Sequence, residues 1–318
     1  MVSTTRKIEK WPLVSVIIPV YNREAYIEQA LDSVLNESYP NLELVVIDDG
    51  STDLSKKIIE QWVACYQNRV SITFVSRENH GFISTLNELI GLAKGEYIVK
   101  FDSDDYLKND GILKRYQYLQ ENPDKLMVIG DCILVDENGQ EQYTSAYESI
   151  GKADRTLMQS DEGMQKFMLL NGYVPGCTLM ARQRVYEKFG LYNLNYNADD
   201  WVYYVFVVAQ NGLGYLNRTV SAYRLHSDNM CFSSHQLTVA CEQLSVLFQL
   251  TGKYKGINQV YLIQRLLWQL CYIPYLAVKF FLTQQRENPV FGVLLKSLLT
   301  FKTLFNQVFD RTYARQGT

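Results

Sequence analysis

Three acidic residues that follow an apolar stretch near residue 100 have the types and spacing of a metal site. In YIVKFDSDDYL, Asp102, Asp104 and Asp105 occur within four positions, and Ser103 separates the first two. Carboxylates this close repel one another unless a cation or backbone donors compensate. A hard ion such as Mg²⁺ or Mn²⁺ takes few protein carboxylates and adds water and phosphate oxygens. Because side chains alternate along an extended chain, we expect Asp102 and Asp104 to share one side and hold a metal diphosphate.

A helix start is the alternative explanation of these acids. An Asp before a helix accepts hydrogen bonds from the first backbone N–H groups and needs no metal. Asp105 would face away from the other two carboxylates and is expected to cap the helix predicted in YLKNDGILKRYQYLQ. A single Asp would fit this explanation, but a cluster in line with other polar strand ends favours the metal site.

The elements that must position these acids alternate between buried strands and amphipathic helices. LVSVIIPVY, LELVVIDD, VSITFVS and EYIVKFD are typical of buried strands, and helical patterns separate them, the first with Asn22 as its expected N-cap. This order predicts a mostly parallel sheet with helices on both faces. Ligands of such sheets bind beyond the carboxyl ends of the strands. The polar residues expected there are Tyr21, Asn22, Asp48, Asp49, Asn79, Gly81, Asp102 and Asp104.

The turn after the second strand has two explanations. Asp48, Asp49 and Gly50 form a good turn sequence in any fold, and Thr52 or Asp53 is suited to cap the next helix. This turn lies at the end of the second strand and beside the end of the first strand. That position favours a nucleotide contact for Asp49 and a structural role for Asp48. Gly81 is expected to allow a close backbone approach, with an ordinary loop glycine as the alternative.

The remainder of the chain is less regular. A hairpin is expected with its turn at Glu137-Asn138-Gly139, a closing strand in YLNRTVSAYRLH, and mostly helix from residue 236 to 316. From His235 onward there are nine Lys or Arg and three acids, so the C-terminal region is basic and the body is acidic.

Composition excludes several classes of protein. The 318 residues, 47% hydrophobic and 20% charged, can form one large α/β domain with an appendage. An acidic body lacks the basic face that nucleic acid requires. The six cysteines show no CxxC pair and indicate a reducing compartment. The start, MVSTTRKIEKWP, lacks a secretory signal, which predicts a cytoplasmic protein.

Four segments together resemble family 2 glycosyltransferases with the GT-A nucleotide-sugar fold. They are VSVIIPVYN, LELVVIDDGSTD, RENHGFISTLNELIGLAKGEYIVKFDSDD and the later ADDW, and the likeness extends from residue 13 to about 228. The resemblance implies an α/β fold with a GT-A, Rossmann-like, mostly parallel sheet and a C-terminal helical appendage. The expected division is a GT-A domain over 1–234, with its nucleotide half at about 13–105 and its acceptor half at about 106–234, followed by a helical region over 235–318.

The resemblance also assigns roles to residues. It implies that Asp49 binds the base, usually uracil, and that Asp102 and Asp104 form the DxD motif that meets ribose, metal and diphosphate. Arg224 would pair with phosphate, and His226, with a structural role as its alternative, would be a third metal ligand beside Asp102 and Asp104. The expected nucleotide-binding set is Pro19, Tyr21, Asn22, Asp49, Asn79, Gly81, Asp102, Ser103 and Arg224.

The segment NADDWVYYVFVVAQNG resembles the acidic pair of the family, whose second member is the catalytic base. An inverting transferase needs a carboxylate that takes the proton of the acceptor hydroxyl, and it needs no nucleophile. The base then maps to Asp200, with Asp199 where the family usually has Glu, so the choice between the two stays open. Two Asp residues at a helix start with a favourable dipole contact are the alternative.

The resemblance implies transfer of a single sugar from a nucleotide donor, expected to be UDP-linked, to a glycan or lipid-linked acceptor, with Mn²⁺ or Mg²⁺. The family's processive members carry a Gln-x-x-Arg-Trp motif, and QRLLW does not have this spacing. The basic apolar helices at the end are expected to pack, with peripheral membrane contact as the alternative. A nucleotidyltransferase and a non-catalytic nucleotide-sugar-binding subunit are the competing functions. The Gly-rich loop of the former is absent from PVYNRE.

Overall fold

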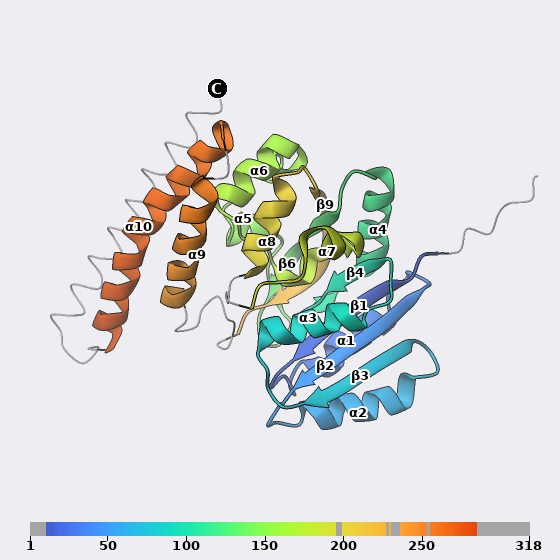
Figure 1. The fold of residues 1–318 in the computed structure, drawn as a ribbon. Coiled ribbons are helices and arrows are strands. Elements are labelled where there is room, and N and C mark those ends of the chain that lie inside the picture. The colour runs from blue at the N-terminus through green and yellow to red at the C-terminus, as the bar shows by residue number, and fades with distance from the viewer. Residues whose placement is uncertain (1–10, 195–198, 227–228, 230–235, 253–254, 285–318) are drawn as a thin grey trace, which may run out of the picture. The chain divides into compact units, whose positions relative to one another are not determined.

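The computed structural model describes residues 11–194, 199–226, 229, 236–252 and 255–284. The chain divides into two compact units, residues 1–227 and 228–318 (Figure 1). The predicted domain boundary between residues 234 and 235 lies outside the described residues.

The first half of the larger unit is a parallel sheet. Its strands are β1 (Val14–Val20), β2 (Leu42–Asp49), β3 (Ser71–Arg77) and β4 (Tyr97–Lys100), in the order β3-β2-β1-β4. The connecting helices are α1 (Ile27–Leu35), α2 (Ser55–Tyr66) and α3 (Phe82–Leu92). The winding reverses beside β1, which pairs with both β2 and β4. Ligands of such sheets bind beyond the carboxyl ends of the strands at this reversal, and Asp49 at the end of β2 and Asp102 after β4 lie there.

The second half of the sheet is mixed and contains strands from later in the chain. Next to β4 come β8 (Leu179–Arg182), β6 (Met127–Val135), β9 (Leu213–Arg224) and β5 (Tyr106–Leu107), while β7 (Glu141–Tyr143) pairs with β6 as the predicted hairpin. β6 and β9 are parallel, and β8 is antiparallel to both β4 and β6. The prediction of an α/β sheet with parallel strands and covering helices is therefore confirmed, and the antiparallel pairings belong to this later half.

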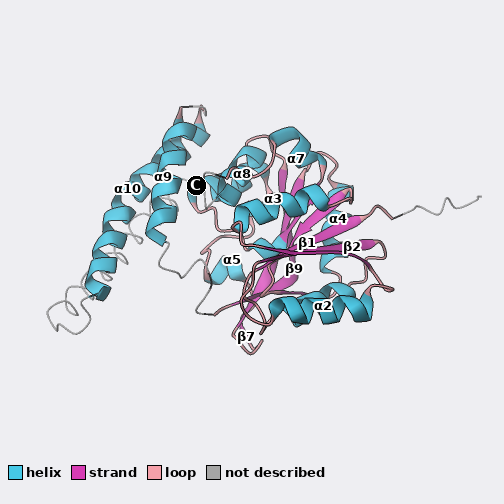
Figure 2. Ribbon diagram, turned by 60° about the horizontal axis from the view of Figure 1, so that its bottom comes forward, coloured by secondary structure: helices cyan, strands magenta, loops and turns pink. Residues whose placement is uncertain are grey.

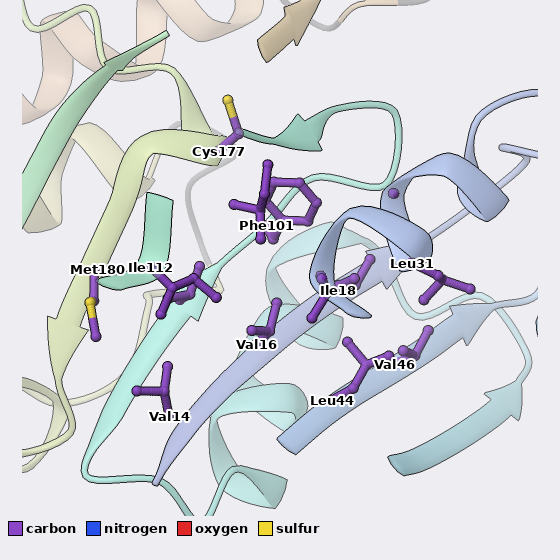
Figure 3. Close-up of a cluster of buried hydrophobic side chains, with 14 of the residues drawn as sticks. Val14, Val16, Ile18, Leu31, Leu44, Val46, Phe101, Ile112, Cys177 and Met180 are labelled. Carbon is purple, nitrogen blue, oxygen red and sulfur yellow. The ribbon is translucent and has the colours of Figure 1, made fainter. Parts of the chain in front are cut away.

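The alternation of side chains along β1 and β2 explains why helices cover both faces. Val14, Val16 and Ile18 of β1 join Leu44 and Val46 of β2 in one core cluster, together with buried residues of α1 and α2 (Figure 3). Because side chains alternate along a strand, the intervening ones point to the other face. The helix α3 packs against β1 and β2 there (Figure 2). Burying an aliphatic side chain contributes about 1.5–3 kcal/mol to the stability of the fold. These apolar strands are therefore stable only when helices cover both faces of the sheet.

Further helices of the larger unit support the later strands. They are α4 (Gly111–Glu121), α5 (Ala146–Ser149), α6 (Asp161–Leu170), α7 (Arg184–Phe189) and α8 (Asp199–Val208), with the 3₁₀ turns η1 (Leu157–Gln159) and η2 (Gly176–Thr178). The η2 turn contacts β4, β6 and β9. It therefore lies against the end of β4, where the acidic cluster begins.

The smaller unit contains α9 (Gln236–Thr251) and α10 (Ile257–Gln284), which pack on each other. This agrees with the helix expected from residue 236 as far as residue 284, and the rest of that prediction lies outside the described residues. Among the helices described, none combines the length and the apolar character that a membrane crossing requires.

Candidate active site

The acidic cluster after β4 forms a turn. Ser103 and Asp104 are turn residues, and the backbone N–H of Asp105 donates to the carbonyl of Asp102 at 3.3 Å. The expectation of an extended chain at these positions is therefore wrong, because the backbone reverses immediately after the strand. The carboxylates of Asp102 and Asp104 remain close enough for the charge of Asp104 to raise the pKa of Asp102.

Asp104 lies between two cationic or ionisable partners. Its Oδ2 accepts from Nε of Arg23 at 3.0 Å and lies 3.0 Å from Nε2 of His226. Burial would raise the pKa of Asp104, but the hydrogen bond with His226 and the charge of Arg23 hold that pKa below its ordinary value. The His226 ring stacks on Tyr26 with 5.3 Å between centroids. The structure thus brings together two of the three predicted metal ligands.

Asp102 faces a different group of residues. Burial raises its pKa, the Lys100 ammonium opposes that shift, and the charges of Asp104 and Asp200 add to it. Gly176 of η2 lies against it, since a Cβ at that position would come within 2.1 Å of Oδ2 of Asp102. A glycine in this turn therefore leaves the space that the Asp102 carboxylate occupies.

Asp105 has a structural role. Its Oδ1 accepts from the backbone N–H of Arg224 at 2.8 Å, and burial, together with the neighbouring Cys177 and Asp104, raises its pKa well above the ordinary value. The prediction that Asp105 caps the next helix is wrong, because the strand β5 intervenes and Asp110 is the N-cap residue of α4.

The Arg224 guanidinium binds backbone carbonyls around the turn. Its Nε donates to the carbonyl of Asp104 at 2.9 Å, and its Nη1 donates to that of Glu137 at 2.9 Å. The guanidinium also lies 4.8 Å from the Tyr26 ring centroid. Arg224 therefore fastens the acidic turn to the β6–β7 hairpin, and its contact with phosphate stays a prediction.

Asp49, at the end of β2, is buried and accepts several hydrogen bonds. The backbone N–H groups of His80 and Gly81 donate to its two oxygens at 2.8 and 3.1 Å, and Arg77 forms an ion pair with it. Arg77 also donates to Glu88 at 2.8 Å. Sequence reasoning missed Arg77, although an arginine at the end of a strand beside DDGS was a usable signal. The Arg77–Asp49 ion pair therefore fixes the Asp49 carboxylate, which is predicted to contact the nucleotide base.

The loop before α3 explains the roles of Asn79 and Gly81. The side-chain Oδ1 of Asn79 accepts from the Gly81 N–H at 3.0 Å. Gly81 is the N-cap residue of α3 and has φ of +87°, which side chains other than hydrogen disfavour. A Cβ at Gly81 would meet nothing within 4 Å among the described atoms, so the backbone angle rather than a protein contact requires glycine.

Asn22 joins the ends of β1 and β2. Its Oδ1 accepts from the Thr52 N–H at 2.8 Å, and its own N–H donates to Oγ of Ser51 at 2.9 Å. The prediction that Asn22 caps the first helix is wrong, because α1 begins at Ile27 with Tyr26 as its N-cap residue. Asn22 has φ of +52°, which Asn tolerates better than most residues do.

The residues on either side of this link differ in exposure. Tyr21 is 47% exposed, which leaves its ring available to a ligand. Pro19 is buried within β1, opposite Ile47 of β2, and Ser103 is buried in the acidic turn. The nucleotide contacts assigned to these three residues stay predictions.

Asp200, in the first turn of α8, reaches the acidic turn through a lysine. Its Oδ1 accepts from the Trp201 N–H at 2.7 Å, and its Oδ2 lies 3.8 Å from Nζ of Lys100. Its carboxylate is 35% exposed, so solvent or a substrate can reach it. Asp199 begins α8, but its side chain lies outside the described residues.

Lys100 is the second functional candidate that sequence reasoning missed. It is 4% exposed, and a lysine inside the apolar run YIVKF was the available signal. Burial would lower its pKa, but the charges of Asp102 and Asp200 raise that pKa above the ordinary value. Lys100 therefore carries its charge between the two acids.

The oxygen and nitrogen atoms of this site suit a divalent metal ion that also binds a ligand of the protein. Within the part of the chain that the structure describes, no three His, Cys, Asp or Glu side chains are grouped closely enough to enclose a metal. Asp104 and His226 offer one oxygen and one ring nitrogen at the same point, and Asp102 lies on the same turn. Mg²⁺ and Mn²⁺ accept two or three protein ligands when phosphate oxygens complete the coordination shell.

Comparison with known proteins identifies the family. The model of the family described as Glycosyl transferase family 2 matches residues 15–190. An uncharacterized glycosyltransferase of Haemophilus influenzae is 32% identical over 224 residues, which cover 70% of this chain and 68% of that protein. Glycosyltransferase GlyG of Streptococcus pneumoniae is 38% identical over 127 residues, 40% of this chain and 41% of that protein. The chain belongs to glycosyl transferase family 2.

Solved structures agree on the fold. S. aureus TarS in complex with UDP-GlcNAc has a TM-score of 0.61 at 20% identity, covering 81% of this chain and 71% of that one. The mannosyltransferase PcManGT from Pyrobaculum calidifontis, in complex with GDP-Man and Mn²⁺, has a TM-score of 0.62 at 19% identity, covering 92% and 81%. The resemblance drawn from the four sequence segments is therefore confirmed, as is the GT-A fold that it implies.

Proposed function

We propose that this chain transfers a single hexose from a nucleotide-sugar, UDP-linked in the first instance, to a hydroxyl of a glycan or lipid-linked acceptor, with inversion at the sugar carbon. The observation that supports this most is the convergence of two acidic elements. One element is the turn after β4, which carries Asp102 and Asp104, and the other is α8, which carries Asp200. The two come from distant parts of the chain, and both interact with Lys100.

The donor is bound at the carboxyl ends of β1, β2 and β4. Asp49 offers a carboxylate oxygen to the imide N–H of a uracil, and the exposed Tyr21 ring lies beside the nucleoside. A divalent metal held by Asp104, His226 and Asp102, which is either Mn²⁺ or Mg²⁺, would offset the negative charge that develops on the departing diphosphate. Residues 102–104 therefore orient the diphosphate, and the sugar extends towards α8.

Asp200 is assigned the role of base. As the acceptor oxygen forms its bond to the anomeric carbon, the bond from that carbon to the diphosphate oxygen breaks, and the Asp200 carboxylate takes the hydroxyl proton. Attack from the face opposite the leaving group inverts the configuration, and no covalent enzyme intermediate forms. The 35% exposure of this carboxylate is compatible with access by an acceptor hydroxyl.

A panel of UDP-sugars and GDP-sugars with Mn²⁺ or Mg²⁺ tests the proposal. We expect release of the nucleoside diphosphate by the native chain, and its loss in Asp104→Asn and Asp200→Asn proteins that retain the native fold. Asp124→Asn is the control, because that side chain is 71% exposed and bonded to none of the site residues. Turnover that survives both site substitutions, or pyrophosphate production from UTP and a sugar phosphate, would overturn the assignment.

Peripheral membrane contact by the smaller unit belongs to the same proposal, because a lipid-linked acceptor is presented at a membrane surface. Val260, Ile263, Leu267 and Leu270 of α10 are between 42% and 55% exposed and recur at helical spacing. The region from His235 carries nine Lys or Arg and three acids. Co-sedimentation with vesicles that contain anionic lipid, and not with neutral vesicles, is the expected result.

A further inference from the structure

Lys100 is a charged side chain in the interior of the sheet. It is the last residue of β4, its backbone pairs with Ile17 of β1, and its side chain is 4% exposed. The strand needs no lysine for its own packing, since Tyr97, Ile98 and Val99 are buried apolar residues. A buried ammonium is costly unless charges and hydrogen bonds compensate it. Its position therefore calls for a role beyond the core.

The surroundings of Lys100 place it between the two acidic elements. Nζ lies 3.8 Å from Oδ2 of Asp200 and 5.3 Å from the Phe82 ring centroid. A Cβ at Gly176 would lie 3.0 Å from this Nζ and 2.1 Å from Oδ2 of Asp102, so both groups border the same glycine. An ammonium carries three N–H donors and can serve two carboxylates at once.

We propose that Lys100 is a positioning residue that holds the Asp200 carboxylate on α8 in a fixed place relative to Asp102 on the turn after β4, and this inference rests on the proposed function. The base Asp200 and the diphosphate holder Asp102 are 98 residues apart in sequence, yet inversion requires them on opposite faces of one sugar. Lys100 lies between them, because its Nζ is 3.8 Å from Asp200 and borders the same glycine as Asp102. The backbone N–H of Trp201 holds the other oxygen of Asp200 and fixes its rotation.

The alternative role for this lysine is a direct contact with the diphosphate of the donor. The two roles differ in what is lost when the charge is removed. A positioning residue is needed in the transition state and affects kcat, whereas a diphosphate contact is needed for donor binding and affects the Kd of UDP.

The Lys100→Met substitution tests the proposal, because Met keeps the length of the side chain and removes its charge. We expect kcat for transfer to fall about 100-fold, as a displaced base would cause, while the Kd of UDP measured by calorimetry with Mn²⁺ changes less than about three-fold. An unchanged kcat, or a loss of UDP affinity as large as the loss of kcat, would overturn the proposal.

Lys125→Met is the matched control. Lys125 is the other buried lysine among the described residues; it pairs with Asp161 and donates to the carbonyl of Asn211 at 2.8 Å. None of these partners belongs to the site, so the substitution should alter thermal stability and leave both kcat and the Kd of UDP within about two-fold. A fall of kcat in this control equal to that in Lys100→Met would show a general structural effect and overturn the proposal.

Two further measurements separate this inference from the proposed function. If Lys100→Met does not fold, Lys100→Arg takes its place, because Arg keeps the charge. Lys100→Arg should retain UDP binding and lose part of kcat. An unchanged kcat together with lost UDP binding would contradict the positioning role. A crystal structure of Lys100→Met should show the Asp200 carboxylate displaced, and an Asp200 in its native place would overturn the inference. Absence of nucleoside diphosphate release by the native chain from every donor would defeat the proposed function alone, since the crystallographic result does not depend on turnover.

Discussion

Nε2 of His226 lies 3.0 Å from Oδ2 of Asp104, although 122 positions separate the two residues in the chain. The same oxygen accepts from Nε of Arg23 at 3.0 Å. One carboxylate oxygen thus joins the end of β4, the loop after β1 and the segment after β9. A metal bound at this oxygen would be shared by Asp104 and His226.

Replacing His226 should change the metal requirement. We expect His226→Ala to raise the Mn²⁺ concentration for half-maximal activity by about ten-fold or more, because one ligand and one partner of Asp104 are lost together. Titration of activity with Mn²⁺ at saturating donor measures the effect. An unaltered metal requirement would show that His226 only packs on Tyr26 and supports Asp104.

The two acids at the end of β2 should respond differently to substitution. Asp48 accepts from Oγ of Ser76 at 3.0 Å and is a structural residue, whereas Asp49 is expected to contact the nucleotide base. Asp49→Asn should weaken UDP binding by about ten-fold, the effect of one charge-assisted hydrogen bond, with Asp48→Asn leaving it within about two-fold. Calorimetry with UDP distinguishes them, and equal losses in both variants would refute the assignment.

The glycine of η2 should be essential for activity but not for folding. Gly176→Ala would bring a Cβ to within 2.1 Å of Oδ2 of Asp102, so we expect the carboxylate to move and turnover to fall about 100-fold. Gly91→Ala in α3 is the control, since a Cβ there meets nothing within 4 Å and should stabilise the helix by about 0.5–1 kcal/mol. Full activity of Gly176→Ala would mean that η2 adjusts without disturbing Asp102.

Asp53 should contribute stability that depends on pH. Burial would raise its pKa, but hydrogen bonds from Ser55 and Glu24 lower that pKa below its ordinary value of 3.8. A lowered pKa in the folded state means stability that is present above 3.8 and lost as the pH falls through the folded value. Asp53→Ala should therefore cost about 1 kcal/mol at pH 7, with the gap to the native chain closing as the pH falls below 3.8. Urea unfolding at several pH values measures this, and a constant gap would contradict it.

Local pattern was sufficient to predict the parallel half of the fold and the ends of its strands. Runs such as VSVIIPV form strands buried on both faces, and the carboxyl ends of such strands meet at one edge. The antiparallel insertion of β8 between β4 and β6 could not be predicted, because strand order depends on contacts between distant segments.

The partners of the site residues were equally hidden in the sequence. Asp105 looks like a helix cap until Arg224, 119 positions later, is seen to donate to it. Asn22 looks like another cap until the Ser51–Thr52 loop is placed beside it. Lys100 was passed over because a charge in a strand has no evident role before Asp200 is placed opposite it.

The buried state of Asp105 alters the electrostatic field that an incoming donor meets. Burial, together with the neighbouring Cys177 and Asp104, raises its pKa well above the ordinary value, so this carboxyl is harder to ionise than an exposed aspartate. A carboxyl that resists ionisation repels an incoming diphosphate less than an exposed aspartate in the same turn would.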